Sequence, residues 1–231
     1  MDAAVLCGGL GTRLRAALPG IPKCLAPVGG QPFLAKVLEQ LTGAGCRRIV
    51  LCIGAQTGGE AVREYCASRA WGTEIAFSEE PAPLGTGGAL ALARPLLTSD
   101  PVCVVNGDSI VPGLDFAAVL RAYAESHAAG TMVTVARTRS DTGAVQLDEG
   151  GRVRAFAEKS AAPGAAYENA GVAVISQDLL RQMQPGPSSL ERDWMPAWIG
   201  KGFHGYVHPG PLYDIGTPER WAQAQAPLAR S

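Results

Sequence analysis

The chain has 231 residues, of which 47% are hydrophobic and 18% charged, and its formal net charge is −1. This length suits one α/β domain with a sizeable core, and the composition excludes a disordered or fibrous chain. The near-neutral charge gives no support to a nucleic-acid or membrane-surface partner, because such partners normally select a basic stripe. No apolar stretch approaches the roughly 20 residues that span a bilayer, and the N-terminus lacks a signal-peptide pattern. We therefore expect a cytoplasmic protein.

The first half of the chain alternates short apolar runs with amphipathic helical patterns. The runs lack polar alternation, which is typical of strands buried on both faces of a parallel sheet. They cover residues 3–7, 48–53, 74–78 and 102–106. The helical patterns cover residues 32–43 (with Pro32 as the first helical residue), a segment that begins at a Thr57–Glu60 capping box, and residues 89–97 and 116–127. This order predicts an α/β fold with a doubly wound, mostly parallel open sheet, in which ligands bind at the carboxyl ends of the strands.

The pattern changes after a further expected strand at residues 131–136. Residues 145–148 and 153–158 flank the turn 149–151 and predict a β-hairpin, and residues 170–175 predict another strand. Residues 185–189 are expected to form a loop. Because no long linker or repeat interrupts the chain, we expect one domain over residues 1–231, with the hairpin as a small embedded subregion.

The six cysteines include no Cys-x-x-Cys pair and lie mostly within apolar runs. We interpret them as small buried hydrophobic residues in a reducing compartment, and not as a disulfide framework or a zinc site.

A glycine-rich loop follows the first expected strand directly, with the sequence Gly8-Gly9-Leu10-Gly11-Thr12-Arg13-Leu14. Glycines allow backbone N–H groups to turn toward a phosphate, and Arg13 adds a forked cation that suits phosphoryl oxygens. The loop is not a Walker loop, because no Gly-Lys-Ser/Thr follows. It also fails the dinucleotide spacing, because Leu14 occupies the place of the third glycine.

A second motif, Pro22-Lys23-Cys24-Leu25-Ala26-Pro27, follows about ten residues after the glycine loop. With both motifs in this order, the chain resembles the sugar-1-phosphate nucleotidyltransferase family over nearly its whole length. The resemblance implies a nucleotide-binding part in residues 1–136 and a sugar-phosphate-binding part in residues 137–231. Its implied nucleotide contacts are Leu6, Gly8, Gly9, Gly11, Thr12, Arg13, Gly85, Thr86 and Gly87.

The implied catalytic residues are Arg13, Lys23 and Asp108, and Mg²⁺ is the implied cofactor. In-line phosphoryl chemistry spreads negative charge over oxygens, so catalysis rests mainly on positioning and electrostatic stabilisation. By resemblance, Asp108 (in Asn106-Gly107-Asp108) and Asp214 (in Tyr-Asp-Ile-Gly-Thr-Pro) are the metal ligands, and carboxylates suit this hard cation. Taken alone, Asp214 before Gly-Thr-Pro is also the pattern of an aspartate that only fixes a turn.

The resemblance places the sugar phosphate against Asn106, Glu158, Lys159, Asn169 and Gly171. Within the family, residues 18–23 and 27–34 and the stretch Ser189-Leu190-Glu191-Arg192-Asp193 look most like guanylyltransferases acting on D-glycero-D-manno-heptose 1-phosphate. GTP and this heptose phosphate are therefore the expected substrates, and surface carbohydrate is the expected destination of the product. The alternative within the class is a mannose- or other hexose-1-phosphate transferase that uses GTP, UTP or dTTP.

Two readings from other classes remain open at this point. A catalytically silent sugar-nucleotide sensor would share the fold, although the intact Arg13, Lys23, Asp108 and Asp214 argue against it. A nicotinamide-dependent dehydrogenase would need a variant glycine loop, against which Leu14 argues. The sequence leaves open whether the chain forms a homo-oligomer.

Overall fold

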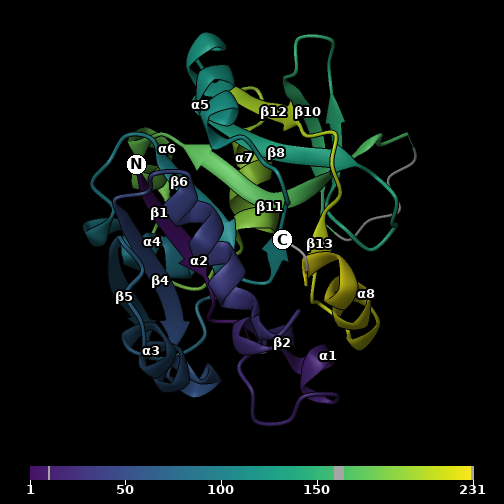
Figure 1. Cartoon of the computed structure of the whole chain (residues 1–231). Coiled ribbons are helices and arrows are strands. Elements are labelled where there is room, and N and C mark those ends of the chain that lie inside the picture. The colour runs from purple at the N-terminus through teal and green to yellow at the C-terminus, as the bar shows by residue number, and fades with distance from the viewer. Residues whose placement is uncertain (10, 159–163, 230–231) are drawn as a thin grey trace.

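A mixed nine-stranded sheet runs through the described part of the chain, which is residues 1–9, 11–158 and 164–229 of this computed structural model (Figure 1). Its strands are β1 (Asp2–Leu6), β4 (Arg48–Gly54), β5 (Glu74–Glu80), β6 (Val102–Asn106), β8 (Gly130–Ala136), β9 (Ala144–Leu147), β10 (Val153–Ala157), β11 (Tyr167–Ile175) and β12 (Phe203–Val207). The strand order is β10-β9-β11-β6-β1-β4-β5, and β8 pairs with both β11 and β12.

The parallel core of this sheet is β6-β1-β4-β5, in which every pair is parallel. Strand β11 then continues the sheet in the antiparallel sense beside β6, and β9 with β10 forms the expected antiparallel hairpin at one edge. The expected α/β class with its doubly wound open sheet is thus confirmed. All four apolar runs of the first half are strands. β1, β4 and β6 are almost entirely buried, as uninterrupted apolar runs predict, whereas the edge strand β5 is mostly half-buried or exposed.

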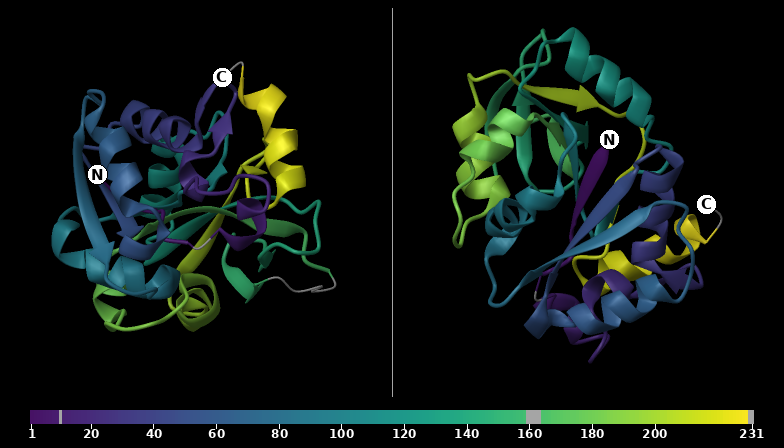
Figure 2. Two further views of the ribbon diagram at one scale, coloured as in Figure 1. Left: turned by 90° about the horizontal axis from the view of Figure 1, so that it is seen from below. Right: turned by 90° about the vertical axis from the view of Figure 1, so that its left-hand side faces the viewer.

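Helices cover both faces of the sheet, as Figure 2 shows from two directions. They are α1 (Thr12–Arg15), α2 (Phe33–Gly43), α3 (Gly59–Ala67), α4 (Gly85–Ala93), α5 (Phe116–Glu125), α6 (Gln177–Gln182), α7 (Met195–Trp198) and α8 (Pro218–Leu228). One apolar cluster joins a face of the sheet to α2, α3, α5 and α8, and the other joins the opposite face to α4, α6 and α7. Helix α2 anchors the first cluster because Phe33, Leu34, Leu38 and Leu41 are fully buried.

Short elements connect these layers. They are the single turns η1 (Lys23–Leu25), η2 (Ala55–Thr57) and η3 (Arg94–Leu96), the π-helical turn η4 (Leu190–Trp194), and the two-residue strands β2 (Pro27–Val28), β3 (Gln31–Pro32), β7 (Ser109–Ile110) and β13 (Tyr213–Asp214). Strand β2 pairs with β3, and β7 pairs with β13.

Two expected helix starts are wrong. The Thr57–Glu60 capping box does not form, because Thr57 lies in η2, where its hydroxyl donates to Gly54 O at 3.1 Å, and Gly58 occupies the N-cap position of α3. Pro32 precedes the first residue of α2, with the extended angles φ −56° and ψ 140°.

The third helix begins four residues earlier than expected, at Gly85, and ends at Ala93, where the turn η3 follows. Glycines 85, 87 and 88 therefore belong to the first turn of α4 and not to a loop before it. The six cysteines are free thiols, five of them buried. Among the described residues, no helix combines the length and apolar character that crossing a membrane requires.

Candidate functional site

The site lies where the direction of strand addition reverses in the parallel core. Strand β1 has β4 on one side and β6 on the other, so successive strands are added first on one side of β1 and then on the other. In open α/β sheets a crevice lies at the carboxyl end of the strands at such a point. The register pairs Leu6 with Asn106, and Gly107 N donates to Leu6 O at 3.0 Å. The glycine loop after β1 and the Asn106-Gly107-Asp108 segment are thereby brought side by side.

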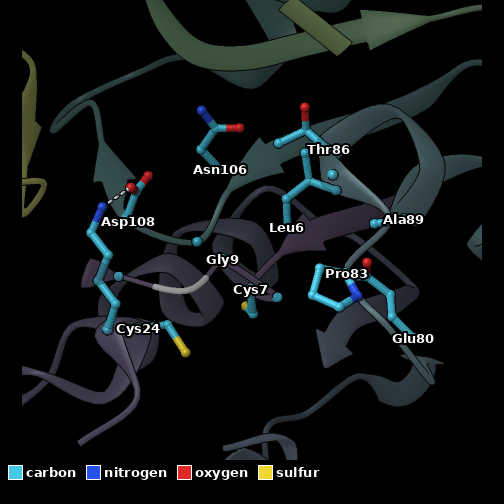
Figure 3. A pocket seen from close by; sticks show the side chains of 15 residues that line it. Leu6, Cys7, Gly9, Cys24, Glu80, Pro83, Thr86, Ala89, Asn106 and Asp108 are labelled. Carbon is cyan, nitrogen blue, oxygen red and sulfur yellow. Dashed lines mark hydrogen bonds and ion pairs between the residues drawn. The ribbon is translucent and has the colours of Figure 1, made fainter. Parts of the chain in front are cut away.

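A cavity of about 340 Å³ occupies this crevice, and we call it the switch-point cavity. Its lining includes Leu6, Gly8, Glu80, Pro83, Ala89 and Asn106. Figure 3 shows Asp108 at one end of this cavity and Glu80 with Pro83 at the other. Its largely apolar walls and few polar groups are typical of a small-molecule site.

A second cavity of about 410 Å³ adjoins it, and we call it the carboxylate cavity. Its lining includes Arg13, Glu158, Asn169, Gly171, Arg192 and Asp214. The two cavities share Lys23, Gly85, Thr86, Asn106 and Asp108. Two ligands in these cavities would therefore meet beside Lys23 and Asp108.

Lys23 and Asp108 form an ion pair at this junction (Figure 3). Lys23 opens the turn η1, where Pro22 and Pro27 restrict the backbone on either side of it. The Lys23 side chain is 16% exposed and that of Asp108 34% exposed, so both groups remain accessible from the cavities.

Asp214 lies beside Asp108 although more than a hundred residues separate them in sequence. Strand β13 pairs with β7, with Asp214 opposite Ser109, and Ile215 N donates to Asp108 O at 3.0 Å. This short antiparallel pair delivers both predicted metal ligands to the carboxylate cavity.

Two arginines hold the Asp214 carboxylate. Arg139 forms an ion pair with it, Arg220 Nη1 lies 3.2 Å from Oδ1, and Gly216 N donates to Oδ1 at 2.9 Å. Burial acts to raise the pKa of Asp214, but the Gly216 hydrogen bond and the two guanidinium charges outweigh it and keep the pKa below its ordinary value. Asp214 is therefore a fixed anion.

A divalent cation fits the chemistry of this pair. Asp108 and Asp214 offer carboxylate oxygens from adjacent hydrogen-bonded strands, and hard cations such as Mg²⁺ take oxygen ligands. The cationic partners Lys23, Arg139 and Arg220 neutralise these carboxylates in the protein alone. A cation at this position would share the two carboxylates with those side chains.

The predicted nucleotide-binding residues lie in three places. Leu6, Gly8, Gly9 and Gly11 line the switch-point cavity, Gly85 and Thr86 line both cavities, and Arg13 lines the carboxylate cavity. Thr12 is exposed on α1, and neither Thr12 nor Gly87 is among the residues that line these two cavities. Gly87 instead packs against a neighbouring segment, where its N–H donates to Ser188 O at 2.9 Å.

The predicted sugar-phosphate residues gather around the carboxylate cavity. Asn106, Glu158, Asn169 and Gly171 all line it, and Lys159 lies outside the described residues. Gly171 has φ +74°, and an added Cβ would lie 3.0 Å from the Asn106 side chain, so the close approach of β11 to β6 requires glycine here.

The structure adds Glu80, which the sequence analysis did not select. This carboxylate is 5% exposed at the carboxyl end of β5. Its Oε2 accepts a hydrogen bond from Leu84 N at 2.7 Å, and its Oε1 approaches Gly8 so closely that an added Cβ there would lie 2.3 Å away. Burial raises the pKa of Glu80, and the Leu84 hydrogen bond lowers it in part. The signal available in the sequence was the pair Glu79-Glu80, which follows the expected parallel strand 74–78.

Three arginines of the carboxylate cavity were also missed: Arg139, Arg192 and Arg220. Arg139 and Arg220 lie outside the motifs, and Arg192 belongs to the stretch 189–193, which was noted for its resemblance without a role for its arginine. The packing of η4, α8 and the segment after β8 around the cavity brings the three together. Arg139 pairs with Glu168 as well as Asp214, and Arg220 pairs with Asp141 as well as Asp214, so an anionic ligand would share these two cations with carboxylates.

Comparison with known proteins agrees with this geometry. Residues 2–229 match the family described as Nucleotidyl transferase. The chain is 35% identical over its full length to a mannose-1-phosphate guanylyltransferase from Mycobacterium tuberculosis and 34% identical over 95% of its length to a mannose-1-phosphate guanyltransferase from Schizosaccharomyces pombe. It spans 65% and 62% of the length of these two relatives.

Solved structures show the same fold. HddC from Yersinia pseudotuberculosis complexed with GMP-PN matches with a TM-score of 0.84 and 26% identity, over 98% of this chain and 99% of that one. A putative glucose-1-phosphate thymidylyltransferase from Bacillus anthracis matches with a TM-score of 0.87 over 100% of this chain and 96% of that one, at 20% identity, which bears on the fold alone. The chain belongs to the nucleotidyl transferase family.

Proposed function

We propose that this protein is a sugar-1-phosphate guanylyltransferase, which forms a GDP-sugar and pyrophosphate from GTP and a sugar 1-phosphate. The observation that carries the proposal is that the two cavities meet at Lys23 and Asp108. The switch-point cavity would hold the nucleotide, and the carboxylate cavity would hold the sugar phosphate. The reaction joins two ligands, and two adjoining sites with a charged junction suit it.

In this proposal a phosphate oxygen of the sugar phosphate attacks the α-phosphorus of GTP, and the bond to the leaving pyrophosphate breaks. The attacking group is already an anion at neutral pH, so no strong general base is needed. Lys23 at the junction and Arg13 at the rim of the carboxylate cavity would stabilise the charge that spreads over the phosphoryl oxygens. Asp108 and Asp214 would hold Mg²⁺, which supplies further charge neutralisation when bound.

Glu80 supports guanine as the base. A carboxylate has only acceptors, whereas the guanine edge that carries N1–H and the N2 amino group presents two adjacent donors. Glu80 lies in the switch-point cavity, at the far end from Asp108 (Figure 3), and Leu84 holds one of its oxygens in place. The guanylyltransferase relatives and the GMP-PN complex of HddC agree with this choice.

The sugar is a finer part of the proposal. The sequence motifs favour D-glycero-D-manno-heptose 1-phosphate, whereas two relatives carry names of mannose-1-phosphate enzymes. Both sugars share the manno configuration, so one cavity lining would serve the ring hydroxyls of either. We keep the heptose phosphate as the first expectation and mannose 1-phosphate as the alternative.

The test is pyrophosphate release with Mg²⁺, crossing five nucleoside triphosphates with heptose, mannose, glucose and galactose 1-phosphates. We expect release with GTP and a manno-configured sugar phosphate. The Glu80→Gln variant should lose about 10- to 100-fold in kcat/KM for GTP, because the amide NH2 group that replaces one carboxylate oxygen is a donor and would face a donor of guanine or the Leu84 N–H. Wild-type turnover with UTP or dTTP in preference to GTP would overturn the base assignment, and no release from any pair would overturn the enzyme assignment.

A further inference from the structure

The segment Ser188–Trp194 is fastened to the first turn of α4. Ser188 O accepts hydrogen bonds from Gly87 N at 2.9 Å and Gly88 N at 3.2 Å, which caps two of the free N–H groups at this helix start. Trp194 Nε1 donates to Ser188 Oγ at 3.1 Å. An added Cβ at Gly85 would lie 2.6 Å from Ser188 O, so this approach depends on glycine. The segment is therefore attached by hydrogen bonds to the wall that both cavities share.

This attachment fixes one oxygen of Glu191. Its Oε2 accepts hydrogen bonds from Thr86 Oγ1 at 2.6 Å and from Ser189 Oγ at 3.1 Å. Glu191 lines the carboxylate cavity, and no hydrogen bond or ion pair to its Oε1 occurs among the described residues. One oxygen is thus held, and the other is left for a ligand.

The hydroxyl of Thr86 is fully used in this arrangement. It accepts from Leu190 N at 2.8 Å and gives its single proton to Glu191. Thr86 consequently has no proton to offer a nucleotide phosphate, although it lines both cavities. The Thr86 hydroxyl instead orients the Glu191 carboxylate.

The chemistry of an oriented carboxylate decides which ligand group it serves. An ionised carboxylate accepts hydrogen bonds and repels phosphates, so Glu191 does not suit the phosphate of the sugar phosphate. Arg192, which lines the same cavity, suits that phosphate, and Arg139 and Arg220 could share it with the carboxylates that they pair with. The ligand groups that donate to a carboxylate are the sugar hydroxyls.

We propose that Glu191 is the residue that accepts a hydrogen bond from a ring hydroxyl of the sugar 1-phosphate, and that Thr86 and Ser189 are positioning residues that aim it. This inference rests on the proposed function and deepens it by assigning part of the sugar specificity to one carboxylate. The nucleotide does not depend on Glu191, because its cavity shares Thr86 and Gly85 with the carboxylate cavity but not Glu191 itself.

The test compares wild-type protein with Glu191→Gln, Thr86→Val and Thr86→Ser, using GTP and the best sugar 1-phosphate. We expect Glu191→Gln to reduce kcat/KM for the sugar phosphate about 10- to 100-fold while the KM for GTP stays within about twofold. Thr86→Val should reduce kcat/KM for the sugar phosphate by a smaller factor. Thr86→Ser should keep kcat/KM close to the wild-type value because serine retains the hydroxyl. In the Glu191→Gln background, Thr86→Val should lower kcat/KM for the sugar phosphate no further, because Thr86 acts on the sugar through Glu191. The hydrogen bond that Leu190 N loses in Thr86→Val should appear in thermal unfolding instead.

Deoxy sugar phosphates give the decisive control. With the analogue that lacks the contacted hydroxyl, kcat/KM of the wild type should fall by the same factor as the Glu191→Gln substitution causes. For Glu191→Gln itself, kcat/KM with this analogue should be no lower than with the full sugar phosphate. Thermal unfolding and the affinity for a fluorescent GTP analogue establish that each variant is folded and binds nucleotide. Unchanged sugar kinetics in folded Glu191→Gln, or an equal rise of both KM values, would overturn the inference alone. A wild type without turnover on any pair would overturn the proposed function and the inference with it.

Discussion

Asp2 is a buried acid, 4% exposed, that ties the first strand to the loop before β6. Its Oδ2 accepts hydrogen bonds from Thr98 N at 2.7 Å, Ser99 N at 3.0 Å and Thr98 Oγ1 at 3.1 Å. Burial acts to raise the pKa of Asp2, but these hydrogen bonds and the charge of Arg48 outweigh it and lower the pKa. The ionised form is therefore favoured by folding.

Asp2→Asn should lower the free energy of unfolding by about 1–3 kcal/mol at pH 7, because a neutral amide oxygen accepts weaker hydrogen bonds than the carboxylate does. A lowered pKa means that this contribution is present above the ordinary value of about 3.8 and is lost as the pH falls through the folded-state value. Urea unfolding of both proteins at pH 7 and at about pH 3 measures this. The difference should shrink in acid, and the exposed Glu60→Gln should change little at either pH. An equal difference at both pH values would contradict the linkage.

Lys23 is the residue whose loss should separate activity from stability most clearly. Its ion pair with Asp108 is partly exposed, and such pairs contribute about 0–1 kcal/mol to folding. Charge stabilisation in a phosphoryl transition state contributes far more, so Lys23→Ala should reduce kcat about 100- to 1,000-fold. Pyrophosphate release and urea unfolding measure the two effects, with the exposed Lys201→Ala as control. Full turnover in Lys23→Ala would refute the proposed role.

At the scale of elements, the start of α4 shows how distant packing overrides a local pattern. The apolar sequence alone predicted a helix from Ala89, and three glycines ahead of it indicated a loop. The helix begins at Gly85 because Ser188, about a hundred residues later, supplies the carbonyl that caps it. Glycine is needed where the two backbones touch.

Gly88→Ala tests this packing, because an added Cβ would lie 2.4 Å from Gly186 O and 2.7 Å from Leu84 Cβ. Alanine gains about 1 kcal/mol of helix propensity, but the forced backbone shift costs about 1–3 kcal/mol or more. We expect a net loss of stability in urea, together with a raised KM for the sugar phosphate as the Ser188–Trp194 segment moves. Gly43→Ala is the matched control: this residue ends α2 with nothing within 4 Å of an added Cβ, and it should be neutral or stabilising. If Gly88→Ala and Gly43→Ala had the same effect on stability, the close approach of Gly88 to Gly186 would not be what excludes a side chain at position 88.

The features that could be predicted from the sequence are those with a local sequence pattern. The strands β1, β4 and β6 were predicted to within a few residues because burial on both faces leaves an uninterrupted apolar run. The edge strand β5 was also predicted, although most of it is only half-buried or exposed. The β7–β13 pair, which brings Asp214 to Asp108, has two residues per strand and no local pattern. Glu80, Arg139 and Glu191 were missed for the same reason, since their roles depend on neighbours far away in sequence. The grouping of the predicted residues around two joined cavities required the fold.

At the scale of the whole molecule, ligand binding should stabilise the fold measurably. The site gathers residues from β1, η1, α4, β6, β11 and β13, so a ligand that bridges them binds the folded state only. At about 100 times its dissociation constant a ligand adds about 2.7 kcal/mol, which corresponds to about 5–10 °C in Tm for a chain of this size. Thermal unfolding with GTP and Mg²⁺ should show this shift, and UTP should produce a smaller one. Equal shifts with every nucleotide would contradict selection of the base.

The buried free thiols can serve as built-in probes of local opening in this protein. Burial raises the pKa of Cys46 and Cys66 to about 11 and that of Cys52 to about 12. A protonated, covered thiol reacts with an alkylating reagent only while its surroundings are open. Because these three cysteines lie beside or within β4 and α3, while Cys103 lies within β6, their separate labelling rates, read by peptide mass, would time the opening of each part of the sheet without any introduced probe.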